Sequence, residues 1–112
     1  MNVARVQEVL AVNVRRLRKE KGLSQVALSR ATGGFVSQAT ISTIEKISTV
    51  SVPGSDTIVS LATALQVEPW RLLVDPDSAV ARLVDSLMSM DPSGRELIEK
   101  IIEREVATRK DR

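Results

Sequence analysis

Apolar residues recur at steps of three and four along most of the chain, a period that predicts amphipathic helices rather than strands. Gly22 and the pair Gly33-Gly34 would end the first two helices. Ser24 and Ser37 would cap the N-termini of the second and third. The pattern predicts helices over residues 3–21, 25–32, 38–46, 55–65 and a short fifth that begins at Pro69. The residues expected to be buried are Val6, Leu10, Val14, Leu17, Val26, Ala27, Leu28, Ala31, Ile41, Ile44, Ile58, Leu61, Ala62, Leu65, Trp70, Leu72 and Leu73.

An irregular connection is expected over residues 47–54, which are rich in β-branched residues and end in Pro-Gly. Two more helices are predicted after the fifth. Two Asp-Pro pairs, Asp75-Pro76 and Asp91-Pro92, each predict a helix start with an N-cap and a proline in the first turn. The helices that follow carry apolar stripes, the first at Val80, Leu83, Val84, Leu87 and Met90, the second at Leu97, Ile98, Ile101, Ile102 and Val106. The expected fold class is therefore all-α, with seven helices.

The amino-acid composition excludes most enzyme mechanisms. The 112 residues include no cysteine and no histidine, so thiolate or imidazole metal sites, cysteine nucleophiles and histidine acid-base catalysis are all excluded. Phe35 and Trp70 are the two aromatic residues, which leaves an aliphatic core. We therefore expect no catalytic site, no cofactor and no metal. With no apolar run long enough to span a bilayer, we expect a cytoplasmic protein without a membrane partner.

The net charge of +2 is unevenly distributed. Residues 1–50 carry eight Lys or Arg against three Glu, whereas residues 51–112 carry eight against eleven Asp or Glu. A basic half of this kind suggests an anionic partner, with nucleic acid the leading candidate. The alternative is that helical surfaces are charged in any case.

The predicted helices over 25–32 and 38–46 are short and joined by a glycine turn, as in a helix-turn-helix, whose second helix enters the major groove of DNA. The outward residues of that second helix are uncharged and able to pair with base edges: Gln38, Ala39, Ser42 and Thr43. The other interpretation is a polar surface helix of a small bundle, in which Ser and Thr are merely tolerated.

Two segments in this order, LRKEKGLSQ over residues 17–25 and VSQATISTIE over 36–45, resemble the Xre-type helix-turn-helix family of lambda-like repressors and Cro proteins. The downstream PGSDTIVSLATALQVEPWRLL is similar to the family's fourth and fifth helices. The resemblance covers residues 10–74 and implies a five-helix lambda repressor-like DNA-binding domain over 1–74. The two additional C-terminal helices would form an extension over 75–112.

Roles follow from the resemblance position by position. It implies that Gln25 touches a phosphate and braces the recognition helix, and that Gln38, Ala39, Ser42 and Thr43 face the bases. Independently of the resemblance, the backbone N–H groups at the helix starts capped by Ser24 and Ser37 would face phosphates favourably. Thr40 and Lys46 match positions that meet the DNA backbone. Arg18 and Glu45 match a structural ion pair that bridges the first helix to the end of the third. The implied partner is double-stranded operator DNA.

The sequence departs from the family pattern in two places. Gly34 and Phe35 correspond to two inserted residues in the turn, and Thr32 stands where a buried Leu or Val is usual. We therefore expect Phe35 to fold back and fill the core near Thr32. The loop after Glu45 lacks the usual glycine and is about two residues longer than usual.

The last two helices lie outside the motif. Either they complete the core, or the stripe Leu97, Ile98, Ile101, Ile102 and Val106 forms a homodimer, since the family usually binds palindromic half-sites as dimers. We favour the dimer because a final helix with two adjacent apolar columns needs more cover than this short chain provides. The function that follows is a prokaryotic or phage transcriptional regulator, a repressor acting by operator occupancy. The alternative is an antitoxin-like module whose C-terminal helices bind another protein.

Overall fold

The computed structural model describes residues 3–47 and 52–110, and this part of the chain is helical with no strand. It contains α1 (Val3–Glu20), α2 (Gln25–Ala31), α3 (Gln38–Lys46), α4 (Ser55–Leu65), the 3-10 helix η1 (Pro69–Leu72), α5 (Ala79–Ser89) and α6 (Pro92–Lys110). The predicted all-α class is confirmed. The chain divides into two units, Met1–Pro76 and Asp77–Arg112.

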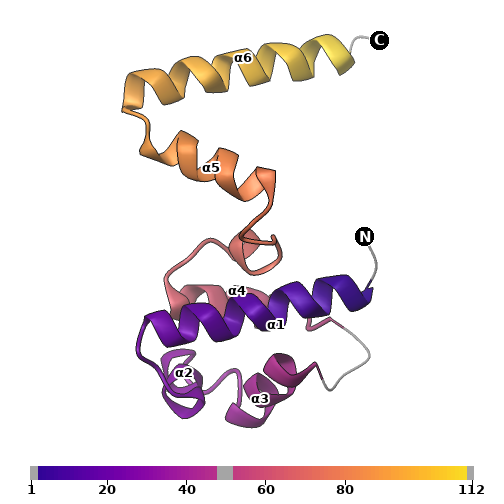
Figure 1. The fold of residues 1–112 in the computed structure, drawn as a ribbon, viewed down its shortest axis with the longest axis vertical. Helices are drawn as coiled ribbons and strands as arrows, with labels where there is room; N and C mark the ends of the chain where they lie inside the picture. The colour runs from indigo at the N-terminus through magenta and orange to yellow at the C-terminus, as the bar shows by residue number, and fades with distance from the viewer. Residues whose placement is uncertain (1–2, 48–51, 111–112) are drawn as a thin grey trace. The chain divides into compact units, whose positions relative to one another are not determined.

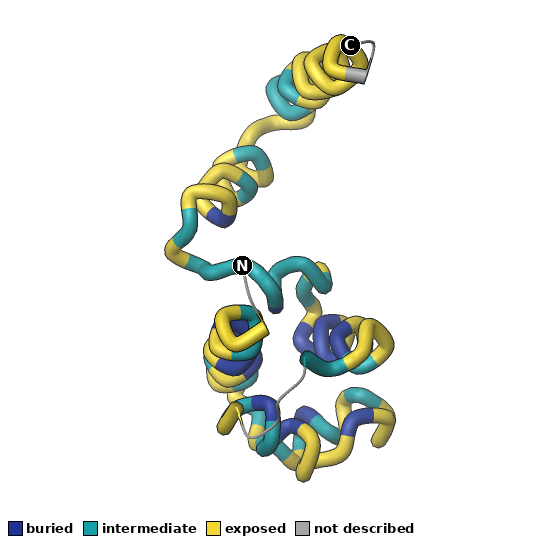
Figure 2. The backbone as a smooth tube through the Cα atoms, turned by 90° about the vertical axis from the view of Figure 1, so that its right-hand side faces the viewer, coloured by how far each residue is buried: buried dark blue, intermediate teal, exposed yellow. Residues whose placement is uncertain are grey.

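In the first unit, α1 packs against α3, α4 and η1, and α2 packs against α3 and α4 (Figure 1). Figure 2 shows buried stretches on the helices of this unit. The core is aliphatic: Leu10, Val14, Leu17, Leu28, Val36, Ile41, Ile44, Ile58, Leu61, Ala62, Leu65 and Leu72. Periodicity predicted most of these residues, because one face of each helix meets this common centre.

Fewer residues of α2 are buried than the sequence predicted. Leu28 is buried, but Val26 and Ala31 are exposed and Ala27 is only half-buried. A helix of seven residues completes barely two turns, so one side chain reaches the centre while its apolar neighbours face outward. The missing core residue is Val36, which lies in the turn after α2.

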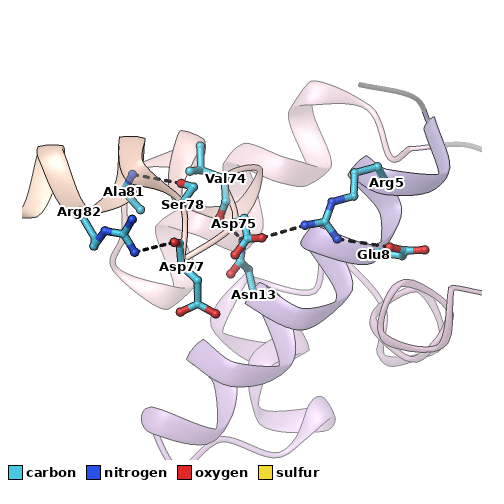
Figure 3. A network of polar contacts seen from close by, with 9 residues as sticks. All are labelled: Arg5, Glu8, Asn13, Val74, Asp75, Asp77, Ser78, Ala81 and Arg82. Carbon is cyan, nitrogen blue, oxygen red and sulfur yellow. Dashed lines mark hydrogen bonds and ion pairs between the residues drawn. The ribbon is translucent and has the colours of Figure 1, made fainter.

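Asn13 is fully buried on α1 and joins this helix to the chain that follows η1. Its Nδ2 donates to the carbonyl of Leu72 at 3.0 Å and also to that of Val74 at 2.9 Å. Figure 3 shows the second of these bonds. A polar residue inside the apolar stripe of α1 is thereby satisfied, and two backbone carbonyls that no helix uses gain a donor.

The predicted helix start at Asp75-Pro76 is wrong. Helix α5 begins at Ala79, and Ser78 is its N-cap, accepting from the N–H of Ala81 at 3.2 Å (Figure 3). The Asp75 carboxylate is instead bound by Arg5 of α1 at 2.8 Å, so it does not cap α5. The second Asp-Pro start is confirmed, since α6 begins at Pro92 and Asp91 accepts from the N–H of Gly94 at 2.8 Å.

The second unit consists of α5 and α6, and no substantial contact between the two helices is present in the described part of the chain. The apolar faces of both are largely exposed, with Val80 and Leu83 on α5 and Leu97, Ile101, Ile102 and Val106 on α6. Each helix is formed by its own period and caps. No described helix is long and apolar enough to cross a membrane.

Candidate DNA-binding face

Helices α2 and α3 begin with the same capping arrangement. The Oγ of Ser24 accepts from the N–H of Ala27 at 3.0 Å, and the Oγ of Ser37 accepts from the N–H of Thr40 at 3.1 Å. The hydroxyl of Ser37 also donates to Oγ1 of Thr40 at 2.9 Å. Each cap satisfies one of the N–H groups that a helix start leaves unpaired, and the positive end of the helix dipole remains at the surface.

The two faces of α3 differ sharply. Ile41 and Ile44 are buried in the core, whereas Gln38, Ala39, Thr40 and Lys46 are exposed, and Ser42 and Thr43 are half-buried. The outward face is uncharged until Lys46 in the last turn. Such a surface offers amide and hydroxyl groups and the methyl of Ala39, which are the groups that pair with base edges.

Gln38 is held by Gln25. Its Nε2 donates to Oε1 of Gln25 at 2.8 Å, which links the first residue of α3 to the first residue of α2. Gln25 in turn interacts with the carboxylate of Glu45 and helps to lower its pKa. Gln38 keeps its second amide N–H and its Oε1 for another partner, the donor and acceptor that a bidentate contact to adenine requires.

Arg18 and Glu45 tie α1 to the end of α3. The Arg18 Nε lies 2.8 Å from one carboxylate oxygen and Nη2 lies 2.9 Å from the other, while Nη1 donates to the carbonyl of Leu23 at 2.9 Å. The side chains are 12% and 5% exposed. The ion pair is therefore largely shielded from water, and its two parallel hydrogen bonds fix the orientation of both groups.

The charge state of this pair follows from its surroundings. Burial alone would raise the pKa of Glu45, but the hydrogen bonds from Arg18, its positive charge, the hydrogen bond from Gln25 and the charge of Arg15 outweigh that, so the pKa lies below its ordinary value. The hydrogen bonds to Glu45 raise the pKa of Arg18 against the opposing effect of burial. Both groups are ionised at neutral pH.

The α2–α3 turn corrects the expectation for Phe35. Its side chain is 61% exposed and does not fill the core near Thr32. Val36, at 2% exposure, occupies the core instead. Gly33 and Gly34 have φ of +71° and +80°, a backbone conformation that glycine adopts without strain, and these two residues carry the chain outward before Val36 turns back in.

Hydroxyl groups stabilise this turn. Thr32 Oγ1 donates to the carbonyl of Ser29 at 2.6 Å and accepts from the N–H of Val36 at 3.1 Å. Ser29 Oγ donates to the carbonyl of Val36 at 2.7 Å. Thr32, where the resemblance implies an apolar residue, hydrogen-bonds the backbone instead. Sequence reasoning missed Ser29, which lies four residues before Gly33, although short hydroxyl side chains often bond nearby backbone groups.

The exit from α3 is strained. Ile47 is the C-cap with φ of +54°, the left-handed conformation that glycine most often supplies at a helix C-terminus. A β-branched residue there is a genuine outlier. The predicted lengthening of this loop falls on residues 48–51, which lie outside the described residues.

Basic side chains surround the same elements. Arg15 and Lys19 on α1, Arg30 on α2 and Lys46 on α3 are exposed, and the charge of Arg15 acts on Glu45 at the end of α3. Guanidinium and ammonium groups of this kind are the usual partners of DNA phosphates.

No group of His, Cys, Asp or Glu able to hold a metal ion occurs in the described part of the chain. A pocket of about 310 Å³ lies on the first unit, and none of the predicted DNA-facing residues lines it. The residues around it are Arg5, Glu8, Val9, Val12, Ile47, Asp75 and Pro76.

The five residues predicted to form a dimer lie on α6. Leu97, Ile101, Ile102 and Val106 are exposed, and Ile98 is half-buried. The structure therefore brings the predicted base-facing and bracing residues together in the first unit, while the dimerisation residues belong to the second.

Comparison with known proteins adds one match. The family model described as Helix-turn-helix matches residues 14–69, which is half of the chain and spans α2, the turn, α3 and α4. No curated protein and no solved structure matches the chain. The order of the elements, the capped helix pair and the family match agree, so this chain belongs to the helix-turn-helix family of the Xre and lambda repressor type, whose members are DNA-binding regulators.

Proposed function

We propose that the protein is a sequence-specific transcriptional regulator of prokaryotic or phage origin, a repressor that acts in the cytoplasm by occupying operator DNA. The observation that carries the proposal is the position of Gln38, held by Gln25 at the N-terminus of α3 with two hydrogen-bonding groups still available. An amide that is already ordered loses less conformational entropy when it binds a base edge.

The proposed roles follow the geometry. Gln38, Ala39, Ser42 and Thr43 face the bases, while the Ser37 cap and Gln25 lie at the helix starts that meet phosphates. Thr40 and Lys46 contact the DNA backbone and add affinity without sequence information. Arg18 and Glu45 do not touch DNA but hold α3 against α1.

A salt titration tests duplex binding. The logarithm of the affinity should fall linearly with the logarithm of salt concentration, with a slope of about 0.9 per contacted phosphate. Lys46→Ala should lower this slope by about 1, whereas Lys100→Ala on α6 is the matched control and should leave it unchanged. An absence of salt-dependent binding to any duplex would contradict the proposal.

The base-reading role of Gln38 is tested with Gln38→Ala on a duplex selected from random DNA. The variant should lose about 1–3 kcal/mol of discrimination at one or two base pairs while its binding to non-specific duplex changes little. An equal loss on every sequence would assign Gln38 to the backbone instead.

We also propose that the protein binds a palindromic operator as a homodimer formed through α6. The apolar stripe of α6 is exposed, and two copies of it would cover each other. A two-fold axis then presents two α3 helices to half-sites about 34–36 Å apart.

A second candidate is an antitoxin-like module that binds another protein. The exposed apolar faces of α5 and α6 favour this candidate, because each could receive an apolar partner surface. A chain that is a stable monomer and shows no duplex binding would support the second candidate over the first.

A further inference from the structure

Phe35 is an exposed aromatic residue in the turn that leads into the recognition helix α3. Its side chain is 61% exposed, and the core position that it was expected to fill is occupied by Val36. The ring is therefore not needed for the packing of the first unit. A large apolar side chain in that position gains stability only when another surface covers it.

The backbone on both sides of Phe35 is fixed. On one side, the positive φ angles of Gly33 and Gly34 shape the turn, and the Phe35 N–H donates to the carbonyl of Thr32 at 3.4 Å. On the other side, Val36 is buried and its N–H and carbonyl are held by Thr32 and Ser29. The ring thus projects from an ordered turn rather than from a loose loop.

Phe35 also lies close in sequence to the residue expected to read DNA. It precedes the Ser37 cap by two residues and Gln38 by three. The N-terminal residues of a recognition helix are the ones that contact base edges. Phe35 is therefore part of the turn that leads directly into the end of α3 that we propose enters the groove.

We propose that Phe35 is a specificity-determining DNA contact that packs on the C5-methyl group of a thymine next to the base pair reached by Gln38. This inference rests on the proposed function. A phenyl ring has no hydrogen-bonding group, and the thymine methyl is the apolar feature that the major groove presents to such a side chain. Gly34 and Phe35, the two inserted residues, would then extend the reading surface beyond α3.

The test begins with the duplex that the full-length protein selects from random DNA. Each thymine of that duplex is replaced in turn by uracil, which removes only the methyl group. At one position, uracil should weaken binding of the wild-type protein about 3- to 10-fold, the effect of losing one buried methyl contact. Phe35→Ala should weaken binding to the thymine duplex by a similar factor and bind the two duplexes equally.

Val59→Ala is the matched control, because Val59 is also exposed and lies on α4, which has no substantial contact with α3 in the described part of the chain. It should not change affinity for either duplex. The Tm of Phe35→Ala should equal that of the wild type, because the ring is exposed, so a loss of binding cannot be attributed to unfolding.

The possible outcomes separate the inference from the function beneath it. If the wild-type protein binds no duplex, both the inference about Phe35 and the proposed function are overturned. A wild-type protein that binds while Phe35→Ala binds equally well overturns the inference and leaves the proposed function intact. Equal losses for Phe35→Ala on the thymine duplex and on every uracil duplex overturn the assignment to a thymine methyl.

Discussion

Both units of this protein contain helices with apolar faces, but these faces are covered in one unit and exposed in the other. In the first unit, the apolar faces of α1, α2, α3 and α4 meet in one aliphatic core. In the second unit, α5 and α6 leave residues such as Leu83 and Ile101 exposed. Figure 2 shows that most positions of these two helices are exposed. The period of apolar residues determines which face of a helix is apolar, but the arrangement of helices decides what covers that face.

The polar interactions of the two units also differ. The first unit is joined by contacts between residues far apart in sequence, among them Arg18 with Glu45 and Asn13 with Leu72. The second contains local ones, such as Ser78 with Ala81, Asp91 with Gly94 and Lys100 with Glu96. Local caps and pairs form individual helices, whereas distant contacts fix their mutual position. The second unit therefore exposes apolar helix faces that another surface could cover. We propose that this surface belongs to a second copy of the chain.

The largest effect is expected from substitutions that disrupt the homodimer proposed to form through α6. Replacing Ile101 and Ile102 by Asp places charges on the exposed stripe of α6, where burial against a second copy would be strongly unfavourable. The variant should sediment as a monomer and bind a two-half-site duplex about 100-fold more weakly, because the second contact is no longer intramolecular. The fold of the first unit should remain intact by circular dichroism.

Glu103→Ala is the control for this change, since Glu103 is an exposed charged residue of the same helix and is not part of the stripe. It should remain dimeric. A double Asp variant that is still a dimer with undiminished affinity would show that α6 is not the interface.

The next effect concerns the stability of the first unit. Glu45→Ala should lower the free energy of unfolding by about 3 kcal/mol, because it leaves the largely buried Arg18 guanidinium without its counter-ion. Glu20→Ala removes the partner of Arg16 in a mostly exposed pair on α1 and should cost less than about 0.5 kcal/mol. Urea unfolding measures both, and similar losses for the two variants would mean that burial of the Arg18–Glu45 pair contributes little.

The same pair makes the stability of the first unit depend on pH. Burial opposes ionisation of Glu45, but its hydrogen bonds with Arg18 prevail, so its pKa is lower in the folded protein than in the unfolded chain. Its contribution is complete above the unfolded value of about 4.3 and is lost as pH falls through the folded value. Glu45→Gln should therefore lose less stability than the wild type between pH 7 and pH 3, as measured by urea unfolding. Equal losses would contradict the prediction.

Much of the fold could be predicted from the sequence where local signals agree. Helix α4 has the predicted bounds because Gly54 and an unbroken apolar period coincide there. The start of α5 could not be predicted, since Asp75 and Pro76 form a good local start, yet Arg5, which is 70 residues away, binds the carboxylate. A distant ion pair overrides a local cap, and no local pattern contains that information.

For the candidate site, the capping serines Ser24 and Ser37 predicted that Gln25 and Gln38 begin their helices, and the structure joins the two side chains by a hydrogen bond. The turn was harder to predict. Thr32 was interpreted as a missing apolar residue that Phe35 would replace, but its hydroxyl bonds the backbone and Val36 takes the core position. Whether a polar residue leaves a gap or makes a hydrogen bond depends on backbone geometry, which the sequence does not display.

The smallest effect concerns backbone strain within the first unit. Gln66 is the C-cap of α4 with φ of +60°, a conformation that costs a residue with a side chain about 1 kcal/mol and costs glycine little. Its side chain accepts a hydrogen bond from Lys21 at 2.8 Å, but that contact is exposed and contributes little. Gln66→Gly should therefore raise the free energy of unfolding by about 0.5–1 kcal/mol.

Gln66→Ala retains the strained backbone and loses the hydrogen bond, so it should be no more stable than the wild type. If glycine proved less stable than alanine, the bond to Lys21 could not explain it, because both variants lack that bond, and relief of strain at α4 would be refuted. Because the change lies in the first unit, the dimer dissociation constant should stay the same, which would separate the stability of the folded core from the association proposed for α6.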